Sequence, residues 1–375
     1  MKKKLTSLLA TASLLTLVGC GGTDEVAQFD LTKALADGEL GYVVLIGEQG
    51  NPEAEDRTKG CDEALAAAAK EYGFTAKKLG EKVCIDTNGN PWNDQIAKET
   101  VEGWASQFKG KLDFIVSNND GMAIAAAGVS SLPKGTPIVG FDALSAACDM
   151  IKAGTLAGSV SQNGDDQALA VVRALTSLIN GSETIIDANY GGKAELNLGD
   201  LDKHIIQTKF AAVTAQNADQ LKPGAYVNLG DDKPGAGKKI LVAYYSANDN
   251  FIKETYQSAL PHYAKALGYE VDEVFGDGLN DALLVEQIQT KVSANNYDGF
   301  AFNVITHSNY ENYLSAVGDK PVVFFNRQPK KSDDSGVADL STKQKVYFVG
   351  SGSTGQGVAQ GQIIKDWFAA NYKKA

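Results

Sequence analysis

The chain contains few of the residues that build metal and redox sites. Its 375 residues include only 4 Cys and 3 His. No CxxC pair occurs, and the three histidines lie far apart in the sequence. Zinc sites need closely spaced Cys and His ligands, so we predict neither a metal nor a cofactor. Three cysteines follow Cys20, and the sequence leaves open whether two of them, Cys61 and Cys84, form a disulfide.

Positive charge is also scarce. The chain has 35 Lys and Arg against 46 Asp and Glu, which gives a formal net charge of −11. An acidic surface repels phosphate backbones, so nucleic acid is excluded as a partner.

Catalytic motifs are absent or incomplete. No GxSxG or HExxH pattern occurs, and GDDKPGAGKK (230–239) lacks the Gly spacing and the Ser/Thr of a phosphate loop. Gly350, Gly352 and Gly355 form a GxGxxG pattern after a predicted strand. A dinucleotide site also needs a second strand with an acidic residue about 20 residues further on, and the chain ends at Ala375. We therefore predict a protein that is not an enzyme.

Long apolar runs are missing except at the N-terminus. Three lysines (2–4) precede an apolar stretch (5–18), and Gly19-Cys20 follows. The stretch is too short to span a bilayer, so it predicts a secretion signal. The small residues before Cys20 are typical of a bacterial lipoprotein signal, in which the cysteine carries the lipid; an ordinary signal peptide with a chance cysteine is the alternative. We expect an exported chain tethered to a membrane through residues 20–40.

The remaining sequence alternates strand and helix patterns in two long stretches. The first runs from a strand at 43–48 to a helix that starts near Ala143, and the second from a strand at 239–246 to a strand at 321–326. Short apolar strands separated by helices of 10–18 residues predict parallel βαβ units. The length favours two domains. We therefore predict an α/β protein with two Rossmann-like lobes, joined by a Pro- and Gly-rich segment at 222–238.

Polar and aromatic side chains recur where the predicted strands end. Parallel strands of an open sheet place such residues at a ligand crevice. Each Asn or Asp alone is more simply read as a helix N-cap, but aromatic residues at these places are not explained as caps. The residues are Asn51, Glu53, Arg57, Asn88, Asn90, Trp92, Asn118, Asn119, Asp120, Asp142, Asp249, Asn250, Phe251 and Asn303.

At these residues the chain resembles the periplasmic galactose/glucose-binding proteins of ABC importers. The matching blocks include GEQGNPEAEDR (47–57), SNNDGMA (117–123), GFDAL (140–144), ANDNF (247–251), PVVFFNRQP (321–329) and VYFVGSGSTGQGVAQGQ (346–362). Compared with the family, the blocks stand in reversed order. The resemblance therefore implies a type I periplasmic-binding-protein fold that is circularly permuted.

The resemblance also implies domain boundaries. Residues 1–19 would be the signal peptide and 20–40 the tether. Lobe one would comprise 41–158, 209–222 and 353–375, and lobe two 162–206 and 239–349, with three crossovers between the lobes. Residues 223–238 would join what are the chain ends in the family.

The site residues follow from matching positions. The resemblance implies rim hydrogen bonds from Asp249, Asn303, Arg57, Asn119 and Asp142, and a ring sandwich from Phe251 and Trp92. At three further positions the family has His, Asp and Asn, where this chain has Asn51, Glu53 and Gln162. The family's calcium loop has no counterpart in ALADGELGY (34–42), so no metal is expected.

The function implied is capture of a hexose, glucose or galactose, by a monomeric lipoprotein that delivers it to an ABC permease. A pentose or nucleoside ligand remains an alternative. Two other classes remain as well: a sugar sensor or adhesin with the same fold, and a sugar-processing enzyme with a carboxylate pair drawn from Asp142, Asp249 and Glu53.

Overall fold

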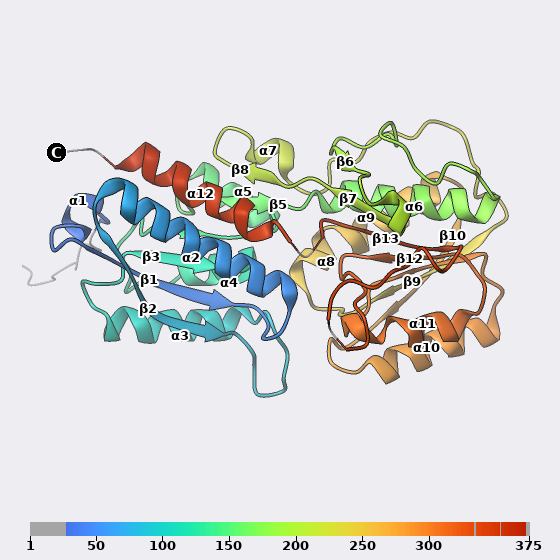
Figure 1. The fold of residues 1–375 in the computed structure, drawn as a ribbon, viewed down its shortest axis with the longest axis horizontal. Coiled ribbons are helices and arrows are strands. Elements are labelled where there is room, and N and C mark those ends of the chain that lie inside the picture. Colours follow the sequence, from blue (N-terminus) through green and yellow to red (C-terminus); the bar gives the residue numbers. More distant parts are fainter. Residues whose placement is uncertain (1–27, 334, 353, 373–375) are drawn as a thin grey trace, which may run out of the picture.

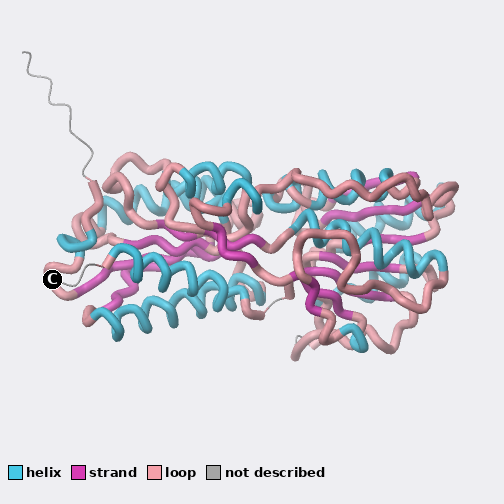
Figure 2. Tube along the Cα trace, turned by 90° about the horizontal axis from the view of Figure 1, so that it is seen from above, coloured by secondary structure: helices cyan, strands magenta, loops and turns pink. Residues whose placement is uncertain are grey.

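The computed structural model describes residues 28–333, 335–352 and 354–372, which form two α/β units side by side (Figures 1 and 2). The predicted signal segment and Cys20 lie outside the described residues. Within them, no helix reaches the length and apolarity of a membrane span.

The first unit, which we call lobe one, is built on a four-stranded parallel sheet of order β2-β1-β3-β4. Its strands are β1 (Glu39–Ile46), β2 (Thr75–Val83), β3 (Phe114–Ser117) and β4 (Ile138–Val139). Its helices are α1 (Leu31–Ala34), α2 (Pro52–Tyr72), α3 (Asp94–Gln107), α4 (Asp120–Ala127), α5 (Ser145–Lys152), α7 (Ala218–Leu221) and α12 (Gln356–Asn371). An antiparallel pair, β5 (Ser159–Ser161) with β8 (Ala211–Val213), lies next to α12 and α5.

Strand β1 is apolar throughout because both of its faces are buried. Leu40 and Val44 pack on one face with residues of α2 and α12, such as Leu65 and Phe368. Val43 and Leu45 pack on the other face with residues of α3 and α4. The strand predicted at 43–48 therefore exists, although it spans Glu39–Ile46.

The C-terminal helix α12 lies along α2, although some 300 residues separate them (Figure 1). Glycines allow this close approach: a Cβ added to Gly60 would lie 2.4 Å from Gly357 Cα. The Trp367 ring stands 5.5 Å from that of Phe114 and 6.5 Å from that of Phe29. The last helix therefore packs on lobe one, beside the first described residues.

The second unit, lobe two, contains a seven-stranded sheet of order β10-β9-β11-β12-β13-β7-β6, parallel except at its β6 edge. Helices α6 and α9 pack together, as do α10 and α11, and Figure 1 shows the two pairs on opposite sides of the sheet. The strands are β6 (Leu196–Asn197), β7 (Ile205–Thr208), β9 (Lys239–Tyr244), β10 (Glu270–Phe275), β11 (Gly299–Phe302), β12 (Val322–Phe325) and β13 (Val346–Gly350). The helices are α6 (Gly164–Asn180), α8 (Asn250–Glu254), α9 (Tyr256–Ala266), α10 (Asp281–Ala294) and α11 (Tyr310–Val317), with 3-10 turns η1 (Leu201–Lys203) and η2 (His307–Asn309).

The structure differs from the sequence prediction at several helix starts. The helix expected from near Ala143 begins at Ser145, and α3 begins at Asp94, two residues after Trp92. Trp92 and Ala143 have φ values of 57° and 58°, which are incompatible with a right-handed helix. Between Ile252 and Ala266 the chain forms two helices, α8 and α9, with a break at Thr255, where ψ is −83°.

The chain passes between the lobes at three short crossings and through the linker segment. Crossings occur at 161–164, 208–211 and 350–356, after β5, β7 and β13. The 222–238 segment, which has no helix or strand, makes a fourth: α7 packs on α5 of lobe one, whereas Tyr226 packs on His262 of α9. The expected domain boundaries already contain this passage, because they place the linker between the end of lobe one at 222 and the start of lobe two at 239.

Candidate ligand-binding site

One pocket at the junction of the lobes collects most of the predicted site residues. Its empty space is about 420 Å³, which includes solvent at its opening. Nine of the ten predicted residues line it, namely Asn51, Glu53, Arg57, Trp92, Asn119, Asp142, Gln162, Asp249 and Phe251. Residues far apart in sequence therefore meet, because all follow the carboxyl ends of strands.

Several of these residues also cap helices. Asn51 Oδ1 accepts the N–H of Ala54, Asn119 Oδ1 that of Met122, and Asp249 Oδ1 that of Ile252. The N-cap interpretation of these residues is therefore confirmed, and their role in ligand binding stays a prediction. The cap fixes one oxygen of each side chain, so that the remaining amide N–H groups or carboxylate oxygen keep a set direction.

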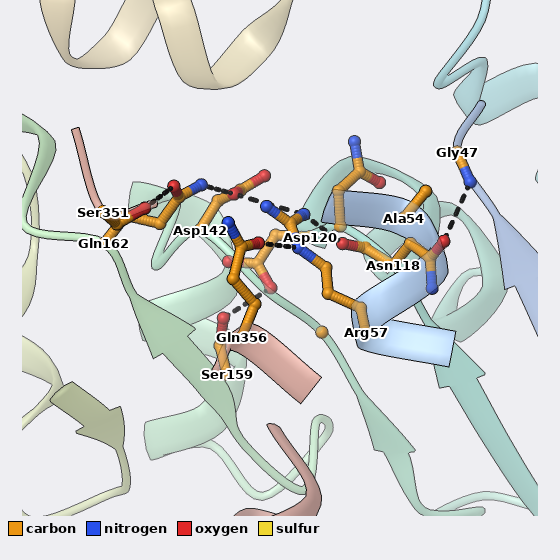
Figure 3. A network of polar contacts seen from close by, with 12 residues as sticks. Gly47, Ala54, Arg57, Asn118, Asp120, Asp142, Ser159, Gln162, Ser351 and Gln356 are labelled. Carbon is orange, nitrogen blue, oxygen red and sulfur yellow. Dashed lines mark hydrogen bonds and ion pairs between the residues drawn. The ribbon is translucent and has the colours of Figure 1, made fainter. Parts of the chain in front are cut away.

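Arg57 is held from three sides beneath the pocket (Figure 3). Its Nε donates to Gln356 Oε1 at 2.6 Å, and its Nη1 donates to the carbonyl of Asn118. The guanidinium also lies over the Phe141 ring, 3.7 Å from its centroid. Burial lowers the pKa of Arg57, opposed by the charge of Asp142. The group remains cationic because arginine starts from a far higher pKa than any working pH.

Asp142 faces Arg57, with 3.8 Å between Oδ1 and Nη1. The same oxygen accepts Gln162 Nε2 at 2.7 Å, and Ser351 donates to Gln162 Oε1 at 2.8 Å (Figure 3). Burial raises the pKa of Asp142 well above its ordinary value, although Arg57 opposes this. Because Ser351 comes from the β13 crossing, this network links the pocket to the connection between the lobes.

Backbone strain is concentrated in this pocket. Trp92, Asp142 and Asn326 have φ values of 57°, 117° and 60°. Side chains other than glycine rarely adopt this region, and non-glycine residues held there cluster at functional sites.

Asn303 is the predicted site residue that does not line the pocket. It is completely buried, and its Nδ2 donates to Phe325 O at 3.1 Å and to Asn326 Oδ1 at 3.2 Å. It therefore supports Asn326, which does line the pocket.

The sequence analysis did not single out Tyr245, Ile252, Asn326 and Arg327, which also line the pocket. Asn326 and Arg327 directly follow β12, so a search for polar residues after the carboxyl ends of strands could have found them. Conversely, Asn118 and Asp120 act as structural supports: Asn118 Oδ1 accepts Gly47 N, and Asp120 accepts Leu144 N and Ser159 Oγ.

Arg327 and Glu48 form an ion pair between the lobes, at 3.0 Å from Nη2 to Oε2. The same Glu48 oxygen accepts Trp92 Nε1 at 3.1 Å and Asn51 Nδ2 at 3.2 Å. Burial raises the pKa of Glu48, but the charge of Arg327 and these donors outweigh it and lower the pKa overall. The structure is therefore a closed form, with Trp92 fixed by a carboxylate that also contacts the other lobe.

The described residues contain no group of three or more His, Cys, Asp or Glu side chains arranged to hold a metal ion. Cys61, Cys84 and Cys148 are buried and free. Cys61 packs with the α2–α12 side of the first sheet and Cys84 with the opposite side, so the possible bridge between them is not formed.

The family models for "periplasmic binding protein domain" match residues 26–183 and 237–310. The D-galactose/methyl-galactoside binding periplasmic protein MglB of Haemophilus influenzae is 35% identical over 187 residues, covering 46% of this chain and 53% of that protein. A xylitol-binding protein of Mycolicibacterium smegmatis is 28% identical over 157 residues, covering 41% of each. The chain thus spans about half the length, or less, of the curated relatives it matches.

Two solved structures share the fold along most of the chain. One is an ABC transporter solute-binding protein from Agrobacterium vitis with bound D-fucose, at a TM-score of 0.54 and 12% identity, covering 89% of this chain and 91% of that one. The other is GanP, a glucose-galactose binding protein from Geobacillus stearothermophilus, at 0.50 and 11%, covering 90% and 93%.

The chain belongs to the periplasmic binding proteins and has their type I α/β fold with parallel sheets. Membership implies an exported protein. The two curated relatives named above are binding proteins by name, in line with the expectation that the chain is not an enzyme.

Proposed function

We propose that this protein captures a hexose, glucose or galactose, and delivers it to an ABC importer. The observation that carries the proposal is the closed pocket between the lobes. Trp92 and Phe251 line it from different lobes, among the buried polar groups of Arg57 and Asp142 and the partly buried Asp249.

This set of groups matches the chemistry of a sugar. A pyranose has a rim of hydroxyl groups, each of which both donates and accepts, and two apolar faces of C–H groups. Carboxylates accept from such hydroxyls, and a guanidinium donates to them in a fixed geometry. Aromatic rings cover the apolar faces. The pocket supplies all three kinds of group.

The relatives support a sugar but differ in which one they bind, because one is named for D-galactose and another for xylitol. Asn51, Glu53 and Gln162 differ in reach from the residues that the galactose/glucose-binding family has at these positions. These three residues are therefore the ones that would decide whether the pocket prefers a hexose, a pentose or a nucleoside.

A ligand panel tests the proposal. We expect D-glucose or D-galactose to raise the melting temperature of the purified protein and to bind in calorimetry, more tightly than D-arabinose, xylitol or adenosine. Asp249→Asn serves as a matched variant that should weaken binding. If none of these ligands binds, the proposed function is wrong; if a pentose or adenosine binds best, the hexose assignment is wrong.

Further experiments distinguish a transport protein from an enzyme and from a sugar sensor. Turnover of glycosides would show an enzyme, and mass spectrometry of small molecules released from protein purified from cells identifies the native ligand. Loss of sugar uptake on deletion of the gene supports import, whereas loss of a sugar response with intact uptake supports a chemosensor.

We also propose that Cys20 carries a lipid that tethers a monomeric protein to a bacterial membrane. Cys20→Ser should release the protein from the membrane fraction and abolish incorporation of a labelled fatty acid. Membrane retention of the variant would contradict the anchor.

We propose further that the order of the sequence blocks is permuted relative to the family. The packing of α12 on α2, and of Trp367 beside Phe29, supports this, because joining the ends there would need little chain. A re-ordered chain, which starts at 239 and joins 372 to 28 through a short linker, should fold and bind the same sugar as the parent. Failure to fold, with a control linker of different length failing as well, would contradict it.

A further inference from the structure

Glu53 stands apart from the other carboxylates of the pocket. Asp142 accepts from Gln162, Asp249 accepts from Tyr245 at 2.6 Å, and Glu48 has three donors. Glu53 is only 8% exposed, yet neither of its oxygens has a hydrogen-bond donor among the described residues. A buried carboxylate without a donor is costly, so this group needs a partner that the other carboxylates already have.

The nearest candidate comes from the opposite lobe. His307, at the start of η2, is 8% exposed, and its Nε2 lies 3.7 Å from Glu53 Oε2. Its Nδ1 lies 2.8 Å from the carbonyl oxygen of Gln328. A carbonyl can only accept, so Nδ1 carries a proton and donates. In a neutral imidazole Nε2 is then a bare acceptor.

Two acceptors therefore face each other across the junction of the lobes. Nε2 of His307 also has no other hydrogen-bond partner among the described residues. One proton on Nε2 resolves the mismatch, because an imidazolium N–H donates to a carboxylate in a charge-assisted hydrogen bond. The charged groups around this position are Glu53 and Arg57 on α2, Glu48 after β1 and Arg327 after β12. Both arginines are hydrogen-bonded to other groups, whereas Glu53 lies within ion-pair distance of Nε2 and has no donor among the described residues, which favours the cationic ring.

We propose that His307 is a positioning residue of the ligand site. In the closed form its protonated Nε2 holds the Glu53 carboxylate from across the cleft, so that this carboxylate is directed at the ligand. The part that concerns ligand binding rests on the proposed function. Since His307 and Glu53 lie on different lobes, opening separates them, and closure then takes up a proton from solvent.

The direction of the pH dependence follows. A free imidazole titrates near pH ~6.5, and an acidic partner gained on closure favours its charged form. Closure is therefore favoured at low pH, and the advantage is lost as pH rises through the range in which the paired imidazolium deprotonates. Ligand affinity falls in the same direction.

Calorimetry in buffers of different ionisation enthalpy measures this proton directly. With D-galactose or D-glucose, near pH ~7, we expect the parent to take up a substantial fraction of a proton on binding. His307→Gln should lose that uptake, because an amide donates without titrating. Glu53→Gln should lose it as well, since the new amide donates to neutral Nε2.

Matched variants test whether other titratable groups cause the proton uptake. His262→Gln changes an exposed histidine of α9 and should keep the uptake. Asp94→Asn removes a carboxyl of the cleft whose pKa burial raises to about 6, and should also keep it. Uptake that persists in both His307→Gln and Glu53→Gln overturns the proposal.

A ligand-free measurement separates this proposal from the proposed function. Small-angle scattering should show the parent more compact at about pH 5.5 than at about pH 8, and His307→Gln equally open at both. If no sugar binds but this difference exists and depends on His307, the sugar assignment fails and the inference stands. If sugars bind and neither scattering nor proton uptake responds to His307→Gln, the inference fails alone.

Discussion

Gly47 lies directly against the indole of Trp92: a Cβ added at Gly47 would stand 2.0 Å from Cε3 of the ring. No side chain can be placed there unless the indole moves. The indole is also hydrogen-bonded to Glu48, one residue along the chain. The end of β1 therefore determines both the position and the tilt of one wall of the pocket.

Gly47→Ala should accordingly displace Trp92 and weaken sugar binding by about 1–3 kcal/mol, the range for an aromatic contact residue. Trp92→Ala should cost a similar amount, and the double variant little more than either alone, because both remove the same contact. Calorimetry on the three variants checks this. Additive losses would show that Gly47 acts on something other than the indole.

Phe251→Ala should weaken binding by about 1–3 kcal/mol in the same assay. Phe251 is 7% exposed and stands edge-on to Tyr256, at 5.9 Å between ring centroids. Val358→Ala, at a residue that is 74% exposed on α12, serves as a control that changes neither affinity nor melting temperature. Parent-like affinity of Phe251→Ala would remove this ring from the site.

Arg57→Lys should lower affinity about tenfold or more, although the charge is kept, because a lysine has one nitrogen and cannot reach both acceptors of the guanidinium. Those acceptors are Gln356 on α12 and the carbonyl of Asn118 after β3. Thermal unfolding, measured alongside calorimetry, should show some loss of stability as well. A lysine variant that binds like the parent would contradict the role of the planar group.

Asp94→Asn should stabilise the protein at neutral pH. Burial, and then the charge of Asp249, raises the pKa of Asp94 to about 6, whereas an unfolded chain has a value near ~3.9. Between these values the folded state holds a proton that the unfolded state has released, so stability falls as pH rises through this window. The variant removes this cost.

We therefore expect the variant's melting temperature to exceed the parent's at about pH 7.5 and to approach it near about pH 4.5. Asp86→Asn is a control that should lower the melting temperature at about pH 7.5. Hydrogen bonds from Asn90 lower the pKa of the Asp86 carboxyl, so its charged form stabilises the folded state. A difference for Asp94→Asn that does not change with pH would show that titration of Asp94 is not its cause.

Cys61, Cys84 and Cys148 should not react with alkylating reagents in the native protein. Burial raises the pKa of Cys84 and of Cys148 to about 12 and that of Cys61 still further, and the thiolate is the reactive form. Iodoacetamide followed by peptide mapping should modify none of them without denaturant and all of them with it. Val358→Cys provides an exposed thiol that must react under native conditions.

The sequence was sufficient to predict the alternation of strands and helices, since strands such as β1 and β9 are buried on both faces and read as unbroken apolar runs. It also located most of the pocket, because parallel strands present their carboxyl ends at one edge. The resemblance to a known family added Gln162, which no local pattern marks.

Other features could not be predicted, because they depend on contacts between distant segments. The positive φ of Trp92 and the break at Thr255 are imposed by tertiary packing, against local helix patterns. The ion pair between Glu48 and Arg327 joins residues 279 positions apart. Asn303 looked like a ligand residue because it ends a strand, and only the structure shows that it supports Asn326 instead.

The packing of α12 on lobe one has a consequence for the order of folding during synthesis. The residues that cover Leu40, Val44 and Phe114 include Ile364 and Phe368, which are among the last to be made. Until they emerge, one face of the first sheet exposes its apolar side chains to water. Lobe two, whose last strand ends at Gly350, becomes complete before lobe one although lobe one begins first. The nascent chain therefore exposes an apolar, aggregation-prone face of the first sheet until α12 has been synthesised.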